Sequence, residues 1–317
     1  MGFQPRDILV NGVGKGTWLR RDFPHLNVIF DSLKELELLA RTAVEQQWRC
    51  GIRIAVSQQT NADYPAFPVQ FGIAPHDVGR AHSILKSAGA HVDVLHFHLR
   101  SNVPSVGEYL GALLELSDIA RKFSITASVV DIGGGLTEPG IDFSGHPRLG
   151  FPADEYVQVI ERINQLFPSL SEIWAENGRF LMAPSTVLVG TIIDSKHVDG
   201  YRILICDAGR TNHAMPSEWE RHYVDLAQCG DWNDTEKTII HGPTCMAYDT
   251  IFQGPFPKQA QIGDRLIYFN AGAYHLPWET RFSAGLCKVL WTIDGNHVEE
   301  IRAEETPDRW FSTWHGY

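Results

Sequence analysis

Positive charge is scarce in this sequence. Its 317 residues include 27 Lys and Arg against 38 Asp and Glu, so the formal net charge at pH 7 is −11. A chain this acidic is repelled by a phosphate backbone, which argues against nucleic acid as a partner. No apolar run approaches the ~20 residues of a membrane span. The opening MGFQPRDILVNG also lacks a basic segment followed by an apolar one, so neither a membrane span nor a secretory signal is expected.

Several motifs of metal and nucleotide sites are missing as well. The five cysteines stand far apart without a C-x-x-C pair, which argues against a zinc ribbon or a disulfide framework and favours reduced thiols in the cytoplasm. No G-x-G-x-x-G is present, so a dinucleotide cofactor is disfavoured. His96 and His98 share one face of a predicted strand, but no third ligand has supporting spacing, and we expect no metal site.

What the sequence does contain is an alternation of short β runs and helical segments in its first half. Such alternation is typical of βα units around a parallel sheet. Later β runs are separated by turn signals without a strong helical segment, which predicts an antiparallel β domain. We therefore expect an α/β fold, with a βα barrel over residues 1–182 and a β domain over residues 183–317. The predicted strands of the first part are 7–12, 26–30, 51–57, 92–99, 125–132 and 172–178, and the predicted helices are 31–47, 75–89, 107–123 and 154–167.

Polar residues stand where these predicted strands end. In a βα barrel the loops after the strands meet at one face. A glycine-rich turn with free N–H groups beside an arginine and a serine suits a phosphate. A carboxylate at the far end suits a protonated ring nitrogen, and an imidazole between them suits stacking on a flat ring, a combination that fits pyridoxal phosphate. One pocket would collect Lys15, Arg53, His98, Ser101, Gly133, Gly134, Gly135, Glu176 and Arg179.

Motifs spread in order along the chain resemble those of one enzyme family. FHLRS (97–101), DIGGGL (131–136), AENGRF (175–180), GPTC (242–245) and GDRLIYFNAGAY (263–274) are similar to stretches of the fold-type III pyridoxal-phosphate decarboxylases, which include ornithine, diaminopimelate and arginine decarboxylases. The resemblance spans nearly the whole chain. It implies an incomplete TIM-type βα barrel followed by an antiparallel β domain, pyridoxal 5'-phosphate as cofactor, and decarboxylation of an amino acid.

The resemblance also implies a role for each matched residue. His98 would stack on the pyridoxal ring, Glu176 would pair with the ring nitrogen, and Cys245 would return a proton to the α-carbon of the substrate. In the family this cysteine loop reaches across a dimer interface, which implies a homodimer. Further implied contacts reach the cofactor from Ser101, Gly133, Gly134, Gly135, Gly178, Arg179 and Tyr274, and the substrate from Arg53, Arg100, Met246 and Asp249.

One expected residue has no match. The family's Schiff-base lysine lies in a strand of Tyr-Ala-Val-Lys type, and none of the eight lysines stands in such a context. Only Lys15 follows a predicted strand end facing the pocket. Three explanations stay open: a truncated or mis-assigned start, a small partner chain that carries the lysine, or a lysine-free relative. The alternatives to a decarboxylase are accordingly an inactive cofactor-binding or regulatory homologue and an amino-acid racemase on the same fold.

Two departures from the family pattern bear on the substrate. Met246 follows Cys245 where ornithine or diaminopimelate enzymes have an acid that would hold the distal ammonium, and a thioether cannot pair with a cation. Arg100 replaces a small glycine and adds a positive charge. We therefore expect a larger or acidic amino acid, as in siderophore-type members of the family, in preference to a simple diamino acid.

Overall fold

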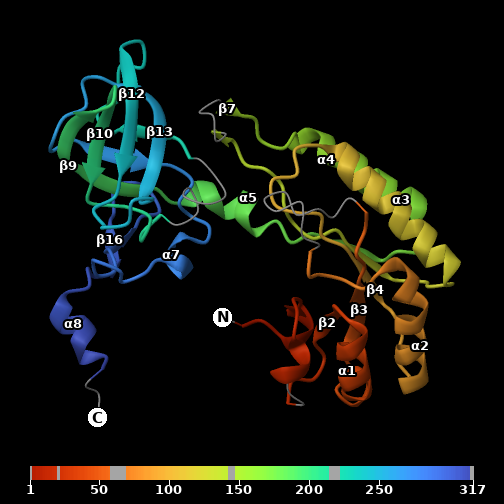
Figure 1. Ribbon diagram of the computed structural model, residues 1–317. Coiled ribbons are helices and arrows are strands. Elements are labelled where there is room, and N and C mark those ends of the chain that lie inside the picture. Colours follow the sequence, from red (N-terminus) through yellow and green to blue (C-terminus); the bar gives the residue numbers. More distant parts are fainter. Residues whose placement is uncertain (1, 20–21, 58–68, 142–146, 214–221, 315–317) are drawn as a thin grey trace. The chain divides into compact units, whose positions relative to one another are not determined.

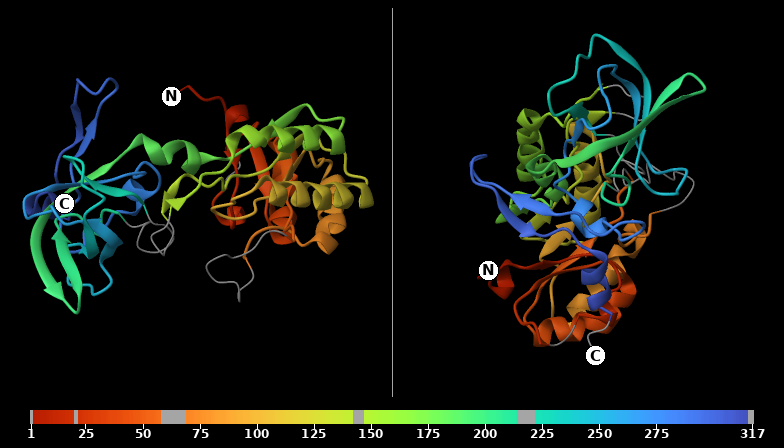
Figure 2. Two further views of the ribbon diagram at one scale, coloured as in Figure 1. Left: turned by 90° about the horizontal axis from the view of Figure 1, so that it is seen from above. Right: turned by 90° about the vertical axis from the view of Figure 1, so that its left-hand side faces the viewer.

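The computed structural model describes all residues except 1, 20–21, 58–68, 142–146, 214–221 and 315–317. The chain forms two compact units, the first comprising residues 1–137 and 150–178 and the second comprising residues 138–149 and 179–317. Figures 1 and 2 show that the first unit combines helices with a sheet, whereas the second consists mainly of strands.

The first unit is built on a wholly parallel sheet of six strands in chain order, β1-β2-β3-β4-β5-β8. Sequential order with right-handed crossovers places the connecting helices on one face, and Figure 1 shows α1 to α4 there. This is the predicted incomplete βα barrel. The strands are β1 Leu9–Val10, β2 Asn27–Phe30, β3 Arg49–Arg53, β4 Val94–His96, β5 Val129–Asp131 and β8 Glu172–Trp174; the helices are α1 Leu33–Glu45, α2 Val78–Ala88, α3 Val106–Lys122 and α4 Tyr156–Leu166, with 3-10 turns η1 Pro5–Asp7, η2 Lys15–Thr17, η3 Pro75–Asp77 and η4 Ala153–Glu155.

Local signals fix where these helices begin and end. Helix α1 follows Ser32, whose hydroxyl accepts a hydrogen bond from the Glu35 backbone N–H at 3.2 Å and so caps the helix. Helix α2 ends at Gly89, whose φ of 92° lies in the left-handed region that glycine adopts without a Cβ penalty. The predicted helix boundaries were therefore accurate to within a few residues.

The face of the sheet that does not carry the helices has an apolar row and, above it, a polar row. Ile29, Gly51, Val94 and Val129 are paired side by side in register. A Cβ at Gly51 would lie 2.4 Å from Ile29 Cδ1 and 2.8 Å from Val94 Cβ, so this row needs a glycine to pack. Because side chains alternate along a strand, the residues two further along share the same face at the carboxyl edge. These are Arg53, His96 and Asp131, again in register.

The second unit contains a barrel-like sheet in the order β11-β14-β9-β10-β12-β13. Its pairs are antiparallel as predicted, except that β10 and β12 run parallel. The reason is that the chain leaves β10 to form β11 at the far end of the sheet before it returns to β12. The strands are β9 Leu188–Val198, β10 Tyr201–Cys206, β11 Val224–Leu226, β12 Thr235–His241, β13 Thr250–Pro257 and β14 Arg265–Tyr268; the unit also has the pairs β6 Gly140–Ile141 with β7 Pro147–Arg148 and β15 Val289–Trp291 with β16 Glu299–Arg302, the turn η5 Ala183–Ser185, and the short helices α5 Gly178–Met182, α7 His275–Trp278 and α8 Pro307–Ser312.

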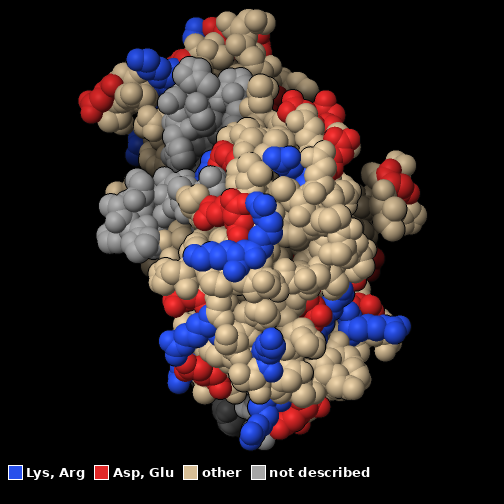
Figure 3. All heavy atoms as spheres, turned by 90° about the vertical axis from the view of Figure 1, so that its right-hand side faces the viewer, with Lys and Arg blue, Asp and Glu red and all other residues tan. Residues whose placement is uncertain are grey.

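The surface carries charges of both signs. On the face drawn in Figure 3, acidic and basic side chains are interspersed among uncharged ones, and an extended basic patch of the kind that binds nucleic acid is not seen there. Among the helices that the structure describes, none combines the length and the apolar character that a bilayer crossing requires.

Candidate functional site

Side chains that follow the first and last strands of the parallel sheet extend the polar row at its carboxyl edge. Asn11 follows β1, and its Nδ2 donates to Glu176 Oε1 at 2.9 Å, although Glu176 follows β8. Asn11 Nδ2 also lies 3.5 Å from His96 Nε2, and His96 Nε2 lies 4.0 Å from Glu176 Oε2. The sheet therefore curves enough for its two ends to meet through polar side chains.

Arg53 forms the cationic part of this row. It is 6% exposed, and its Nη1 lies 3.8 Å from Asp31 Oδ1. Its Nε, like Nδ1 of His96, is buried without a hydrogen-bond partner among the described residues. Buried polar atoms are usually satisfied, so these two atoms indicate a site shaped for a polar ligand.

The glycine turn after β5 packs against the loops after β4 and β8. The Gly134 N–H donates to Nδ1 of His98 at 3.1 Å, and the Gly133 N–H donates to Asp131 Oδ1 at 2.9 Å. A Cβ at Gly133 would lie 2.8 Å from His98 Nδ1, and one at Gly134 would lie 2.4 Å from the Glu176 carbonyl oxygen. The bare backbone thus allows three strand-end loops to converge, and it brings His98 and Glu176 to one turn.

Burial sets the protonation of the two titratable groups beside this turn. Burial raises the pKa of the Asp131 carboxyl to about 7, and the neighbouring Glu176 charge adds to the effect. Burial also lowers the pKa of His98 to about 4, with the Arg53 charge as the second cause. At neutral pH His98 is therefore neutral, and because its Nδ1 accepts from Gly134, its Nε2 carries the proton.

Two other predicted site residues of the first unit lie on the loop after β4. Ser101 is exposed. Arg100 forms a two-pronged ion pair with Glu108 of α3, in which Nη2 lies 2.9 Å from Oε1 and Nη1 contacts Oε2. Glu108 therefore already neutralises the cation that the sequence suggested for a substrate carboxylate, and the role of Arg100 stays a prediction.

Three further predicted cofactor contacts fall at or after the end of the first unit. Gly178 begins the short helix α5, with open space where a Cβ would lie. Arg179 is 8% exposed and paired with Glu138, which is 2% exposed. Tyr274 is 46% exposed at a φ of 67°, in the turn that precedes α7. Arg179 and Tyr274 belong to the second unit, whereas Gly178 is the last residue of the first.

The buried carboxylate of Asp249 accepts hydrogen bonds that hold the GPTC loop (residues 242–245) of the second unit. Its Oδ1 accepts from the Arg210 N–H at 2.6 Å, and its Oδ2 accepts from the Thr244 hydroxyl at 2.6 Å and the Thr244 N–H at 3.2 Å. Cys245 is exposed and Met246 half-buried on the same loop, whereas Asp249 is 1% exposed. The predicted substrate contact of Asp249 stays a prediction, and its observed contacts are those of a residue that shapes the loop.

The comparisons with known proteins agree on one family. Residues 1–183, more than half of the chain, match the family described as "Pyridoxal-dependent decarboxylase, pyridoxal binding domain". The chain belongs to the pyridoxal-dependent decarboxylases. The cofactor of this family is pyridoxal phosphate, and the polar row fits such a group, because it offers buried unsatisfied donors, a glycine turn and a carboxylate at one edge.

Relatives from this decarboxylase family match most of this chain at low sequence identity. The diaminopimelate decarboxylase of Archaeoglobus fulgidus is 26% identical over 295 residues, which cover 87% of this chain and 68% of that protein. An L-glutamyl acyl-carrier-protein decarboxylase of Niallia circulans is 24% identical, over 97% of this chain and 77% of that protein. The crystal structure of Helicobacter pylori diaminopimelate decarboxylase with L-lysine superposes with a TM-score of 0.80 at 21% identity, covering 99% of this chain and 80% of that one. That likeness shows the shared fold.

Part of the polar row could not be predicted from the sequence. Asn11, Asp31 and Asp131 were not singled out as site residues, and His96 was considered only as a metal ligand that lacked a third partner. Once the register of the strands is known, side-chain alternation places Asp131 and His96 on the same face as Arg53. The register itself cannot be obtained from one sequence.

Stability in acid should depend on His98. Its pKa of about 4 lies below the ~6.5 of a histidine in the unfolded chain. As the pH falls from ~6.5 toward 4, the unfolded chain binds a proton that the folded chain does not, so the free energy of unfolding decreases. We expect His98→Gln to remove about 2–3 kcal/mol of this loss at about pH 4.5, measured by urea unfolding of the cofactor-free protein against neutral pH. The exposed His91→Gln should keep the wild-type acid loss, and an unchanged loss in His98→Gln would refute the assignment.

Proposed function

We propose that this chain binds pyridoxal phosphate at the polar row of its first unit and takes part in the decarboxylation of an amino acid. The observation that carries the proposal is the convergence of His98, the glycine turn and Glu176 at one sheet edge, with Gly134 N 3.1 Å from His98 Nδ1. Family membership supports the same conclusion. When bound, the cofactor supplies an electron sink for the electron pair left when the α-carboxylate departs.

Each residue of the first unit would make one kind of contact in this reaction. Glu176 would accept a hydrogen bond from the N–H of the pyridine ring, because its carboxylate is partly exposed and is already oriented by Asn11. His98 would lie against the ring as a neutral imidazole, held by Gly134. The N–H of Gly135 and the hydroxyl of Ser101 would bind the phosphate, with Gly133 and Gly134 as bare backbone beside it, because their own N–H groups already donate to Asp131 and His98. Arg53 would attract the substrate carboxylate, because its Nε is a buried donor that still lacks an acceptor among the described residues.

Residues of the second unit would complete the reaction. Cys245 would transfer the proton of its exposed Sγ to the α-carbon after carbon dioxide leaves. Arg179 and Tyr274 would add contacts to the phosphate, which requires Arg179 to share its guanidinium between the phosphate and Glu138. Gly178, which precedes Arg179, would leave room for the phosphate because no atom lies within 4 Å of a Cβ built there.

The substrate class proposed is a larger or acidic amino acid. Met246 offers no charge to a distal ammonium, and Arg100 could meet a distal carboxylate if Glu108 releases it. The Niallia circulans relative, whose name gives a glutamyl group as its substrate, supports a family member that acts beyond diamino acids. Release of carbon dioxide from ornithine or diaminopimelate in preference to glutamate and its larger derivatives would reject this class.

The test of the proposed function begins with cofactor binding. We expect saturable binding of pyridoxal phosphate to the purified chain, with Glu176→Gln weakening it about tenfold, because the ring nitrogen loses a charged partner worth about 1–2 kcal/mol. Equilibrium dialysis measures both. The exposed Glu155→Gln should bind as the wild type does. Absence of saturable binding, or equal affinity of both variants, would contradict the proposed site.

A second candidate function is cofactor binding without catalysis by this chain alone. Lys15 favours it, because this lysine is fully buried, with Nζ 2.8 Å from Glu35 Oε2 and in contact with the Gly12 carbonyl. The other seven lysines are exposed. Borohydride reduction of the cofactor-loaded chain, followed by peptide mass spectrometry, separates the two functions: a pyridoxyl group on a lysine supports catalysis by the chain itself, and saturable binding without one supports the second candidate.

The oligomeric state of the chain depends on which chain supplies the lysine that binds the cofactor. We propose that the chain forms a homodimer or pairs with a small chain that carries the missing lysine. Light scattering of the purified chain should give twice the monomer mass in the first case. In the second, carbon dioxide release should require the added partner, and a monomer that is active by itself would exclude both arrangements.

A further inference from the structure

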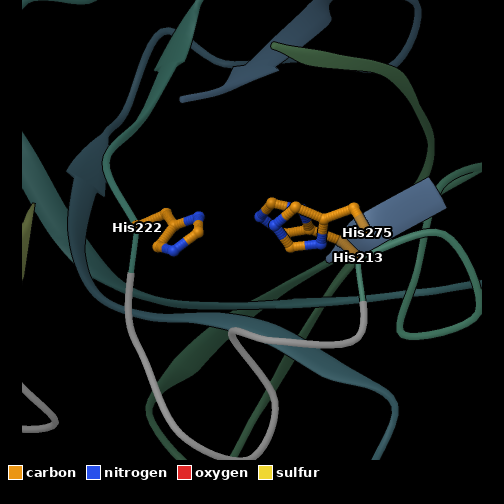
Figure 4. Close-up of side chains that lie close together, drawn as sticks. All are labelled: His213, His222 and His275. Carbon is orange, nitrogen blue, oxygen red and sulfur yellow. The ribbon is translucent and has the colours of Figure 1, made fainter. Parts of the chain in front are cut away.

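Three histidines from separate segments of the second unit meet in its interior, as Figure 4 shows. His213 lies in the turn region after β10, His222 lies two residues before β11, and His275 is the first residue of α7. They are 0%, 4% and 3% exposed. Histidine is usually only partly buried, so three buried imidazoles at one place need an explanation.

The rings face one another closely enough to share a ligand. One ligand nitrogen from each ring can be chosen so that all three lie within 4.8 Å of one another. His213 and His275 are stacked with ring centroids 4.1 Å apart, and His222 meets them edge-on at 5.1 Å and 5.6 Å. Figure 4 shows His222 opposite the stacked pair, on the other side of the space between them.

Packing alone does not account for His213. Both of its ring nitrogens are buried without a hydrogen-bond partner among the described residues. A buried polar atom without a partner costs free energy that an apolar side chain would not.

We propose that His213, His222 and His275 bind one divalent transition-metal ion of the zinc class. Imidazole nitrogens suit zinc, cobalt and nickel, whereas calcium and magnesium require oxygen ligands. Three histidines with a fourth position left open are an established zinc ligand set. Tetrahedral bonds of ~2.0–2.1 Å place the nitrogens ~3.3 Å apart. The rings therefore need to approach by about 1–1.5 Å on binding, which rotation of the stacked pair can supply.

This site is separate from the cofactor site. A second group with comparable spacing, His96, Asp131 and Glu176, belongs to the polar row already described and supports no site of its own. The expectation of no metal rested on His96 and His98, and the three histidines of the second unit did not enter it.

The metal would also hold the turn that presents Tyr274. Tyr274 directly precedes His275 and adopts a left-handed φ of 67°, a conformation that side chains other than glycine rarely take. An ion bound to His275 would fix this turn against the two other histidines. This consequence, unlike the metal site, rests on the proposed function, in which Tyr274 contacts the cofactor phosphate.

The experiment titrates Co²⁺ into untagged, chelator-treated full-length protein without pyridoxal phosphate. We expect visible d–d absorption that saturates at one equivalent and is abolished by Zn²⁺. His222→Gln and His275→Gln should each weaken binding on the order of 100-fold, since loss of an outer-sphere partner alone costs up to that much. His197→Gln and His297→Gln alter exposed histidines and should leave the titration unchanged.

Folding and thiol binding are controlled within the same experiment. Circular dichroism shows whether each variant folds, and because the wild-type titration is decisive by itself, a variant that fails to fold does not remove the test. No saturable spectrum in the wild type would overturn the proposal. So would a sulfur-to-cobalt charge-transfer band from exposed Cys229 or Cys245, or unchanged binding in folded His222→Gln and His275→Gln. Because no cofactor is present, this failure is distinct from failure to bind pyridoxal phosphate.

Discussion

Gly135→Ala is expected to abolish cofactor binding and to lower the free energy of unfolding by about 2–5 kcal/mol. Gly135 has a φ of 101°, and a Cβ there would lie 2.0 Å from the Arg100 carbonyl oxygen, which is backbone and cannot turn aside. Its own carbonyl accepts from the Val103 N–H at 2.8 Å. An added methyl group must therefore separate the loop after β5 from the loop after β4.

The loops after β4 and β5 carry predicted contacts to the cofactor. The loop after β4 contains His98 and Ser101, and the glycine turn after β5 donates to His98 through Gly134. Separating the loops would remove the imidazole from the turn that holds it, so the predicted ring contact and phosphate contacts would be lost together.

A matched control isolates the clash from the backbone strain. Gly89 at the end of α2 has a φ of 92°, close to that of Gly135, but nothing lies within 4 Å of a Cβ built there. Gly89→Ala should cost only about 1–2 kcal/mol and leave cofactor affinity unchanged. Urea unfolding and equilibrium dialysis with pyridoxal phosphate measure both quantities. Equal costs at the two positions, or retained affinity in Gly135→Ala, would show that the close approach to Arg100 is unimportant.

The parallel sheet could be predicted from the sequence because its signals are local. Short apolar runs, the helical periodicity between them and the turn residues after them each lie within a few residues of one another. The same signals indicated which side chains stand at strand ends, and thus His98 and Glu176. Family motifs then identified the decarboxylase branch, to which the match over residues 1–183 assigns the chain.

Features that depend on distant pairing could not be predicted in this way. The parallel pairing of β10 with β12 depends on β11 lying at the opposite edge of the sheet, and nothing in β10 or β12 encodes that placement. The partner of Arg179 is Glu138, 41 residues away, because an extra hairpin, β6 with β7, belongs to the second unit. The three buried histidines lack a spacing motif, since His275 stands 53 residues after His222 in the sequence and meets it only in the folded unit.

Asp249→Ala should destabilise the second unit by about 3–5 kcal/mol, because it leaves buried donors without an acceptor. The carboxylate is 1% exposed and accepts from Arg210 N and from the N–H and hydroxyl of Thr244. Gly209 and Gly242 surround it so closely that a Cβ at either would lie 2.7 Å and 2.4 Å from its oxygens. Water cannot replace the lost oxygens readily in so tight a space, so the loop that carries Cys245 should lose its shape.

Asp225→Ala is the matched control for Asp249→Ala. Its Oδ1 also accepts three hydrogen bonds, from Leu226 N at 2.7 Å, Gly230 N at 3.1 Å and Trp232 Nε1 at 3.1 Å, but the residue is only half-buried. Because water can reach those donors, Asp225→Ala should cost only about 1 kcal/mol. Urea unfolding followed by tryptophan fluorescence measures the difference. If the two substitutions cost the same, burial beneath the GPTC loop is not what makes Asp249 important, and its predicted contact with the substrate becomes the better account of the residue.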